Sequence, residues 1–210
     1  NNAALENHFY YSKYHFNLFS NFTFFLNDPV NGDQIRQRES RDLFGCQTKL
    51  SLDKDKGRWN FKSVYGTGFR ADKTKGSELS STLNKTVLLS GIQLGNINET
   101  NAFVFLDENI STGKWLFNIG NRLDYFNFNY YDNIAQHQLP SRSKVIHSPK
   151  FNIQYTVNKS TQLYVKTGKG FHSNDTRVVT GNSDSKNILP ASYGADLGIF
   201  LKPAHSLLIN

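Results

Sequence analysis

The polar motif His172–Arg177 is the segment of this chain best suited to bind a charged ligand. Its side chains His172, Asn174, Asp175 and Arg177 offer an imidazole, an amide, a carboxylate and a guanidinium within a short stretch. Charge-assisted hydrogen bonds from such groups recognise anionic ligands or the polar surface of another domain. A structural role explains the same residues: Asn and Asp hold backbone groups at the base of a loop, and Arg177 pairs with Asp175. The sequence leaves both interpretations open.

Further candidate cations lie in segments in which apolar and polar residues alternate, at the polar positions. Alternation with a period of two is the signature of a strand whose two faces meet different surroundings. Charged side chains on an enclosed face need water or charged partners, so we expect them to line a wide, wet interior. The inward-facing cations predicted in this way are Arg58, Lys62, Arg70, Arg122 and Lys166, and three further charged candidates, Arg36, Arg38 and Glu39, lie in a predicted outer loop.

The sequence carries no motif for catalysis or for metal binding. The single cysteine, Cys46, excludes an intramolecular disulfide framework and a multi-cysteine zinc site. The histidines form no HExxH pair, and no serine lies in a GxSxG motif. The formal net charge is +7, but Lys and Arg are spread along the chain without a continuous basic stripe. We predict a protein that is not an enzyme, uses no cofactor or metal and binds no nucleic acid; a basic interior suits an anionic ligand.

Alternating segments recur along the whole chain. In the first, Tyr14, Phe16 and Leu18 form one predicted apolar face. No apolar run approaches the roughly 18 residues of a transmembrane helix, and no helical stripe stands out. The predicted strands are 13–26, 41–52, 58–70, 99–109, 115–126, 150–157, 162–170 and 193–202, and a ninth begins near Ser206.

Short and long connections alternate between these strands. The short ones contain Gly, Asp, Asn or Lys, as solvated turns do, and the long ones are predicted at 27–40, 71–98, 129–147 and 172–192. A soluble sandwich would place turns at shorter and more regular intervals. Tight turns on one side and long loops on the other are typical of outer-membrane barrels.

Two tryptophans support a membrane orientation. Trp59 follows Gly57, and Trp115 follows Gly113, at the same spacing after a short turn and on the apolar face. Both indoles are therefore predicted at one depth, where an interfacial aromatic girdle belongs. The alternative is that both tryptophans belong to the core of a sandwich.

The predicted fold is all-β: an antiparallel, up-and-down, transmembrane β-barrel segment. A lumen wide enough for the inward charges needs many strands, and barrels of about 22 strands carry a plug. The chain supplies about nine strands, so we expect residues 1–210 to be part of a single barrel domain without a plug domain.

Several segments resemble the barrel of TonB-dependent outer-membrane receptors. The resemblance is carried by Leu163–Arg177 (LYVKTGKGFHSNDTR) and Leu189–Pro203 (LPASYGADLGIFLKP), with support from Asn27–Gly45 and Gly113–Tyr125. It implies a bacterial outer-membrane receptor that takes up a scarce ligand, typically a siderophore or metal chelate, with energy from the TonB complex. It also implies a plug domain of the same parent protein, membrane lipid and lipopolysaccharide as partners. The cations above and the His172–Arg177 motif then become candidates for contact with ligand or plug.

Two other classes of function remain possible from the sequence. A passive porin-like or structural outer-membrane barrel would share the strands but need no plug. A soluble β-sandwich binding module would need a second sheet to cover the apolar faces.

Overall fold

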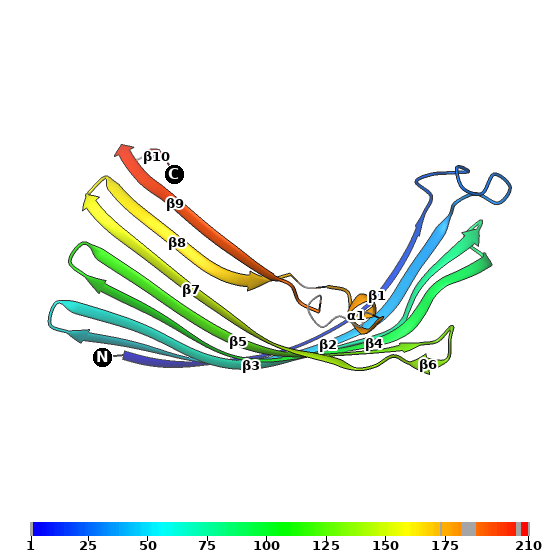
Figure 1. Ribbon diagram of the computed structural model, residues 1–210, viewed down its shortest axis with the longest axis horizontal. Helices are drawn as coiled ribbons and strands as arrows, with labels where there is room; N and C mark the ends of the chain where they lie inside the picture. The colour runs from blue at the N-terminus through cyan, green and yellow to red at the C-terminus, as the bar shows by residue number, and fades with distance from the viewer. Residues whose placement is uncertain (1, 173, 182–187, 205–206, 210) are drawn as a thin grey trace.

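The computed structural model describes residues 2–172, 174–181, 188–204 and 207–209. They form one strongly curved antiparallel sheet, with a single turn of helix over its concave face (Figure 1). The elements are β1 (Asn2–Ser20), β2 (Ile35–Lys56), β3 (Trp59–Leu83), β4 (Val87–Thr112), β5 (Trp115–Asp132), β6 (His137–Gln138), β7 (Arg142–Asn158), β8 (Thr161–Phe171), α1 (Thr176–Gly181), β9 (Ala191–Ala204) and β10 (Leu207–Ile209).

Neighbours in the chain are neighbours in the sheet. The order is β1-β2-β3-β4-β5-β7-β8-β9-β10, and the short β6 pairs with β5. This confirms the predicted all-β, up-and-down antiparallel topology. Within the described residues the sheet does not close on itself, and no second sheet covers it, which argues against the sandwich alternative. The predicted start of the ninth strand, Ser206, lies outside these residues. No helix among them is long and apolar enough to cross a membrane.

The strands are longer than predicted, and two of the four predicted long loops, 71–98 and 129–147, are largely strand. Residues 71–98 form the paired ends of β3 and β4, which are 25 and 26 residues long. They are joined by a tight turn in which Asn84 and Lys85 have φ of 49° and 65°. Of the predicted loop 27–40, residues 35–40 belong to β2 and the rest is loop, whereas most of 129–147 belongs to β5, β6 and β7. The end of β3 is mostly polar, and the apolar residues at the start of β4, such as Val87, Leu88 and Leu89, follow one another without alternating, so neither stretch shows the pattern that reveals a strand in sequence.

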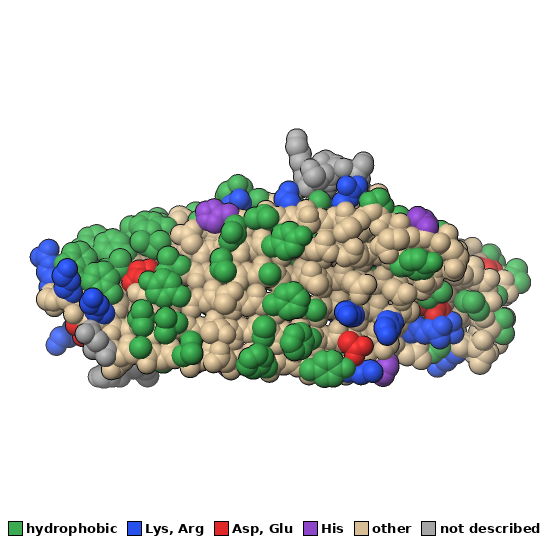
Figure 2. Space-filling model, turned by 90° about the horizontal axis from the view of Figure 1, so that it is seen from below, with side chains coloured by type: hydrophobic (Ala, Val, Ile, Leu, Met, Phe, Trp, Pro, Cys, Tyr) green, Lys and Arg blue, Asp and Glu red, His purple; other side chains and the backbone are tan. Residues whose placement is uncertain are grey.

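The convex face carries a broad apolar band (Figure 2). Large side chains in it are freely exposed, among them Phe9 at 75% and Leu197 at 79%. The strand register places Trp59 opposite Thr112, and Thr112 opposite Trp115, which confirms that both indoles lie at one level. Exposed apolar surface on this scale marks a contact with lipid or with another protein.

Towards the C-terminal end of β1, the side chains predicted on the outer apolar face point to the opposite face. Tyr14 and Phe16, predicted on the apolar face, lie on the concave side, where the Tyr14 hydroxyl donates to Glu39 (2.9 Å). The pairing register of β1 with β2 is set nearer the N-terminus of β1. There the Tyr10 ring covers Gly45 and leaves no space for a Cβ. Beyond the apolar band the outer surface is wet, so β1 places polar Lys13 outward and Tyr14 and Phe16 inward.

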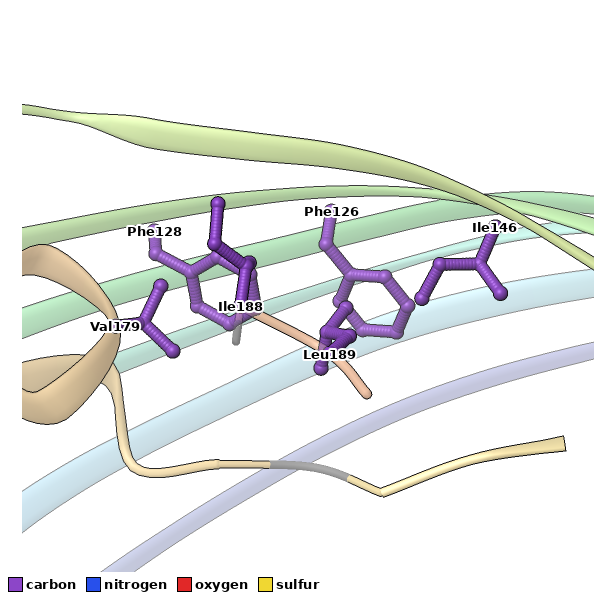
Figure 3. Packing of buried hydrophobic residues seen from close by; sticks show 6 residues of the cluster. All are labelled: Phe126, Phe128, Ile146, Val179, Ile188 and Leu189. Atoms are coloured by element: carbon purple, nitrogen blue, oxygen red, sulfur yellow. The ribbon is translucent and has the colours of Figure 1, made fainter. Parts of the chain in front are cut away.

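A small apolar core lies on the concave face. Figure 3 shows Val179, Ile188 and Leu189 gathered against the β5 and β7 side chains Phe126, Phe128 and Ile146. The rings of Phe126 and Phe128 stack with centroids 5.8 Å apart, and Phe171 meets Phe126 edge-on. This core fixes the segment after β8 against the inner wall of the sheet.

Candidate functional site on the concave face

The helix α1 begins at the predicted polar motif. The Asp175 carboxylate accepts the backbone N–H of Arg177 (2.8 Å), and the Asp175 carbonyl accepts that of Val179 (3.0 Å). Asp175 is therefore the N-cap of α1, and Gly181 stands at its end. This structural role of Asp175 is one of the two that the sequence left open.

The Arg177 side chain ties α1 to the sheet. Its Nε and Nη2 donate to Asp175 (2.9 and 2.6 Å), and its Nη1 donates to Gln93 of β4 (2.9 Å). The hydrogen bonds from Arg177 hold the pKa of Asp175 below its ordinary value. Arg177 is thus held at three points, with its guanidinium oriented over the concave wall.

A second contact joins α1 to a half-buried carboxylate. Thr176 Oγ1 donates to Glu99 of β4 (3.2 Å), beneath the start of the helix. Burial raises the pKa of Glu99, because the ionised form loses its water. Placing a carboxylate here therefore costs stability at neutral pH.

Beside Glu99 lies an arginine–aspartate cluster formed by Arg41, Arg70 and Asp72. Arg41 Nε and Arg70 Nη2 donate to the Asp72 carboxylate at 2.6 and 2.8 Å, and Arg41 Nη1 also donates to Tyr14 (3.0 Å). Asp72 is almost fully buried. Burial opposes its ionisation, but the hydrogen bonds from the two arginines outweigh burial and lower the pKa of Asp72. The cluster is a fixed array of oriented guanidinium groups on the inner wall.

Predicted site residues that are far apart in the sequence line one pocket on the concave face. The pocket lies between β1–β4 and α1, and among its lining residues are Tyr14, Phe16, Arg38, Glu39 and Arg177. Mixed aromatic and charged linings suit a polar small molecule that must be oriented. The pocket brings together one candidate from the His172–Arg177 motif and two from the predicted outer loop.

The outer-loop placement of Arg36, Arg38 and Glu39 is wrong, because all three lie in β2. Arg36 Nη2 lies 2.5 Å from Glu78 of β3, and Arg38 also pairs with Glu78. The Glu78 side chain is only 5% exposed. Long-range pairing with β3 turns this stretch into strand.

The other predicted cations are spread along the strands. Arg122 is paired with Asp124 (2.8 Å), and its guanidinium stacks 3.8 Å from the centroid of Phe103. The remaining positions are as follows: Arg70 is in the arginine–aspartate cluster, Arg58 is exposed in the turn beside Trp59, Lys62 is exposed opposite Asp53, and Lys166 lies 4.4 Å from the centroid of Tyr164.

Two residues of the polar motif lie before the helix. His172 is exposed, and its backbone N–H donates to the Pro190 carbonyl (3.0 Å). Asn174 is half-buried. Neither lines the pocket. In the part of the chain that is described, no three His, Cys, Asp or Glu side chains are placed to hold a metal ion.

The sequence prediction missed the helix α1 and several residues of the site. Asp175 followed by Gly181 is the spacing of a helix N-cap and end, and that signal marks α1. Arg41 and Asp72 gave no signal, because only the register of β2 and β3 brings them together. Phe126 and Phe128 lie on the polar face of their strand, where the core with Val179 and Ile188 buries them.

A curved antiparallel sheet with an apolar outer face and a charged inner face is typical of the wall of a transmembrane β-barrel. The chain belongs to the TonB dependent receptor-like, beta-barrel family, whose model matches residues 1–206.

Solved structures agree on the fold. The ferric citrate transporter FecA in its unliganded form superposes with a TM-score of 0.76 at 16% identity, over 95% of this chain and 30% of that one. BauA, the ferric preacinetobactin receptor from Acinetobacter baumannii, gives a TM-score of 0.73 at 8% identity, over 96% and 33%. The chain thus spans about a third of the length of these structures. No curated protein sequence matches it.

Proposed function

We propose that this chain is part of the barrel wall of a bacterial outer-membrane receptor that takes up an anionic metal chelate with energy from the TonB complex. Family membership supports the receptor class. The neighbours that transport ferric citrate and bind ferric preacinetobactin make an iron chelate the first class of ligand to test.

The observation that carries the proposal is the pocket between α1 and β1–β4. Arg38 and Arg177 reach it from distant parts of the chain, next to the carboxylates of Glu39 and Glu78. Aromatic Tyr14 and Phe16 supply apolar walls. Guanidinium groups bind carboxylates through paired hydrogen bonds, and a fixed group loses less entropy when it does so. Arg177 is already held by Asp175 and Gln93. It is therefore prepared to orient an anionic ligand.

The remaining partners follow from the same proposal. A plug domain of the parent protein would fill the space on the concave side, against the inward charged residues. The apolar band would face membrane lipid, and lipopolysaccharide would meet the mixed charges beyond it. Residues 1–210 would then be one stretch of a single barrel domain.

Iron uptake by the full-length receptor tests this function. Cells that lack their own copy of the gene would carry the receptor or its Arg177→Gln variant, with Arg58→Gln as a matched control outside the pocket. The probes are radioactive ferric citrate and a panel of ferric siderophores, supplied with and without functional TonB. We expect TonB-dependent uptake of at least one chelate. A lost charge-assisted hydrogen bond should weaken apparent affinity by about tenfold or more in Arg177→Gln.

Each other outcome contradicts a separate part of the proposal. Uptake that is independent of TonB would make the protein a passive pore. TonB-dependent uptake with equal affinities for the Arg177→Gln and Arg58→Gln variants would remove the pocket from ligand binding. Absence of uptake for every chelate would exclude the ligand class.

A further inference from the structure

Charges of opposite sign are separated across the sheet at its short-turn end. The carboxylates of Asp53 and Asp55 both accept hydrogen bonds from Asn60 (3.0 and 2.8 Å). The register places Asp53 opposite Lys62 on the concave face, so the acidic groups of this turn point inward. Lys54 lies opposite Phe61, and Lys56 lies opposite Trp59, so these lysines share the convex face with the apolar band.

The neighbouring turns extend this basic edge. Lys114 lies in the β4–β5 turn, where its Nζ donates to the Val157 carbonyl of β7 (2.8 Å), and Lys159 lies in the β7–β8 turn. Arg58 stacks on the outer aromatic row, 5.6 Å from the Trp59 ring centroid. We call the five exposed cations of these adjacent turns the basic rim: Lys54, Lys56, Arg58, Lys114 and Lys159.

The basic rim borders the apolar band directly. In Figure 2, Lys and Arg side chains gather at the left end of the convex face, just past the hydrophobic side chains. On that face the register places the carboxylate of Glu108 opposite Ser63 and Ile119, within the band. Its Oε1 is buried without a hydrogen-bond partner. Among the described residues, the acids of the rim's own turn, Asp53 and Asp55, lie on the concave side with Asn60 and so leave the convex face of the rim positive.

We infer that the basic rim binds the headgroups of anionic phospholipids in the membrane leaflet at the short-turn end. The apolar band places this rim at headgroup depth, beside the level of Trp59 and Trp115. Lys and Arg at a membrane surface attract anionic lipid phosphates, whereas a zwitterionic headgroup carries no net charge for them to recognise. The inference rests on the membrane location proposed above and not on transport or on the ligand.

Lipid selectivity of the full-length receptor in bilayers tests the inference. The receptor is reconstituted in phosphatidylcholine with spin-labelled phosphatidylglycerol or spin-labelled phosphatidylcholine, and electron spin resonance measures the fraction of each held at the protein. About 1 kcal/mol per basic side chain at the surface corresponds to roughly a fivefold preference for phosphatidylglycerol. Salt near 1 M should abolish the preference, since the screening length falls to about 3 Å.

Three variants locate the effect. Replacing all five rim cations with Gln should abolish the preference, whereas Lys→Arg changes at the four rim lysines should keep it. A control with Lys13→Gln, Lys73→Gln and Lys75→Gln changes lysines beyond the other end of the band and should also keep it.

Specific results would overturn the inference. No preference in the unaltered receptor, a preference that persists in the Gln rim variant, or one lost only in the control variant would each exclude the rim as the lipid site. Flotation of the reconstituted vesicles separates the two proposals: a receptor that fails to float with lipid refutes the membrane location, while one that floats without selectivity refutes only the rim.

Discussion

Removing the two buried methyl groups of Val179 should weaken the packing of α1 against the inner wall of the sheet. Val179 is 1% exposed against Phe128, while its neighbour Val178 is 60% exposed. Val179→Ala removes two carbons worth about 0.8 kcal/mol each and leaves a small cavity, about 2 kcal/mol in total. That energy corresponds to roughly a thirtyfold change in the docking equilibrium.

Hydrogen exchange followed by mass spectrometry measures this equilibrium on the full-length receptor in detergent. Amides of 176–181 should exchange roughly thirtyfold faster in Val179→Ala, because exchange follows local opening. Phe128→Leu, which thins the other side of the same contact, should accelerate the same amides. Val178→Ala is the matched control and should change exchange little, since an exposed substitution costs at most about 0.5 kcal/mol.

The reasoning fails if Val179→Ala and Val178→Ala give the same exchange. It also fails if Phe128→Leu leaves the 176–181 amides unchanged, because the helix would then be held by polar contacts alone. A uniform acceleration across β5 as well as α1 would mean that the wall itself had loosened.

Three further predictions concern charge and packing. The pKa of Asp175 is lowered in the folded protein, so its cap stabilises α1 fully above the ordinary carboxyl pKa near 4. This stabilisation is lost as the pH falls through the lowered pKa. Protection of the α1 amides, corrected for intrinsic exchange rates, should therefore decline below about pH 4. The raised pKa of Glu99 has the opposite sign, so Glu99→Gln should slow exchange of α1 at pH 7 and have little effect at acid pH, where the carboxyl is already neutral. Gly68→Ala should lower the unfolding temperature in detergent, because a Cβ would lie 2.4 Å from the Phe103 ring, whereas Gly170→Ala, with nothing within 4 Å, should not. Equal unfolding temperatures for the two variants would contradict the packing argument.

The part of the fold that sequence reveals is the part in contact with two different surroundings. Around Phe69 and Tyr125 each strand has one apolar and one polar face, and the alternation there gave the strands and their topology. Beyond the apolar band this alternation is lost: the end of β3 resembles a loop in composition, and the start of β4 has apolar residues that do not alternate with polar ones. Only pairing with a neighbouring strand distinguishes the two, and a single chain segment does not carry that information.

The same limit separates the predicted from the missed parts of the site. Arg177 and Asp175 were found because they are local to each other. Arg41 and Asp72 meet only through the register of β2 and β3, and a shift between Thr74 and Ser77 changes that register again. Local composition marks a polar motif, but register decides which motifs share a surface.

Distance along the strand axis, more than position in the chain, determines what each part of this wall contacts. Strand β3 starts beside the basic rim at Arg58, crosses the apolar band at Tyr65 and Phe69, and then presents Asp72 to the concave side. Because adjacent strands are antiparallel and in register, their residues at one level join into the same zone. Arg38 and Arg177, far apart in sequence, therefore line one pocket. A substitution in this wall should accordingly be interpreted by its level and face in the sheet: under the proposals above, a Lys→Gln change tests lipid contact at the rim and tests ligand or plug contact on the concave side.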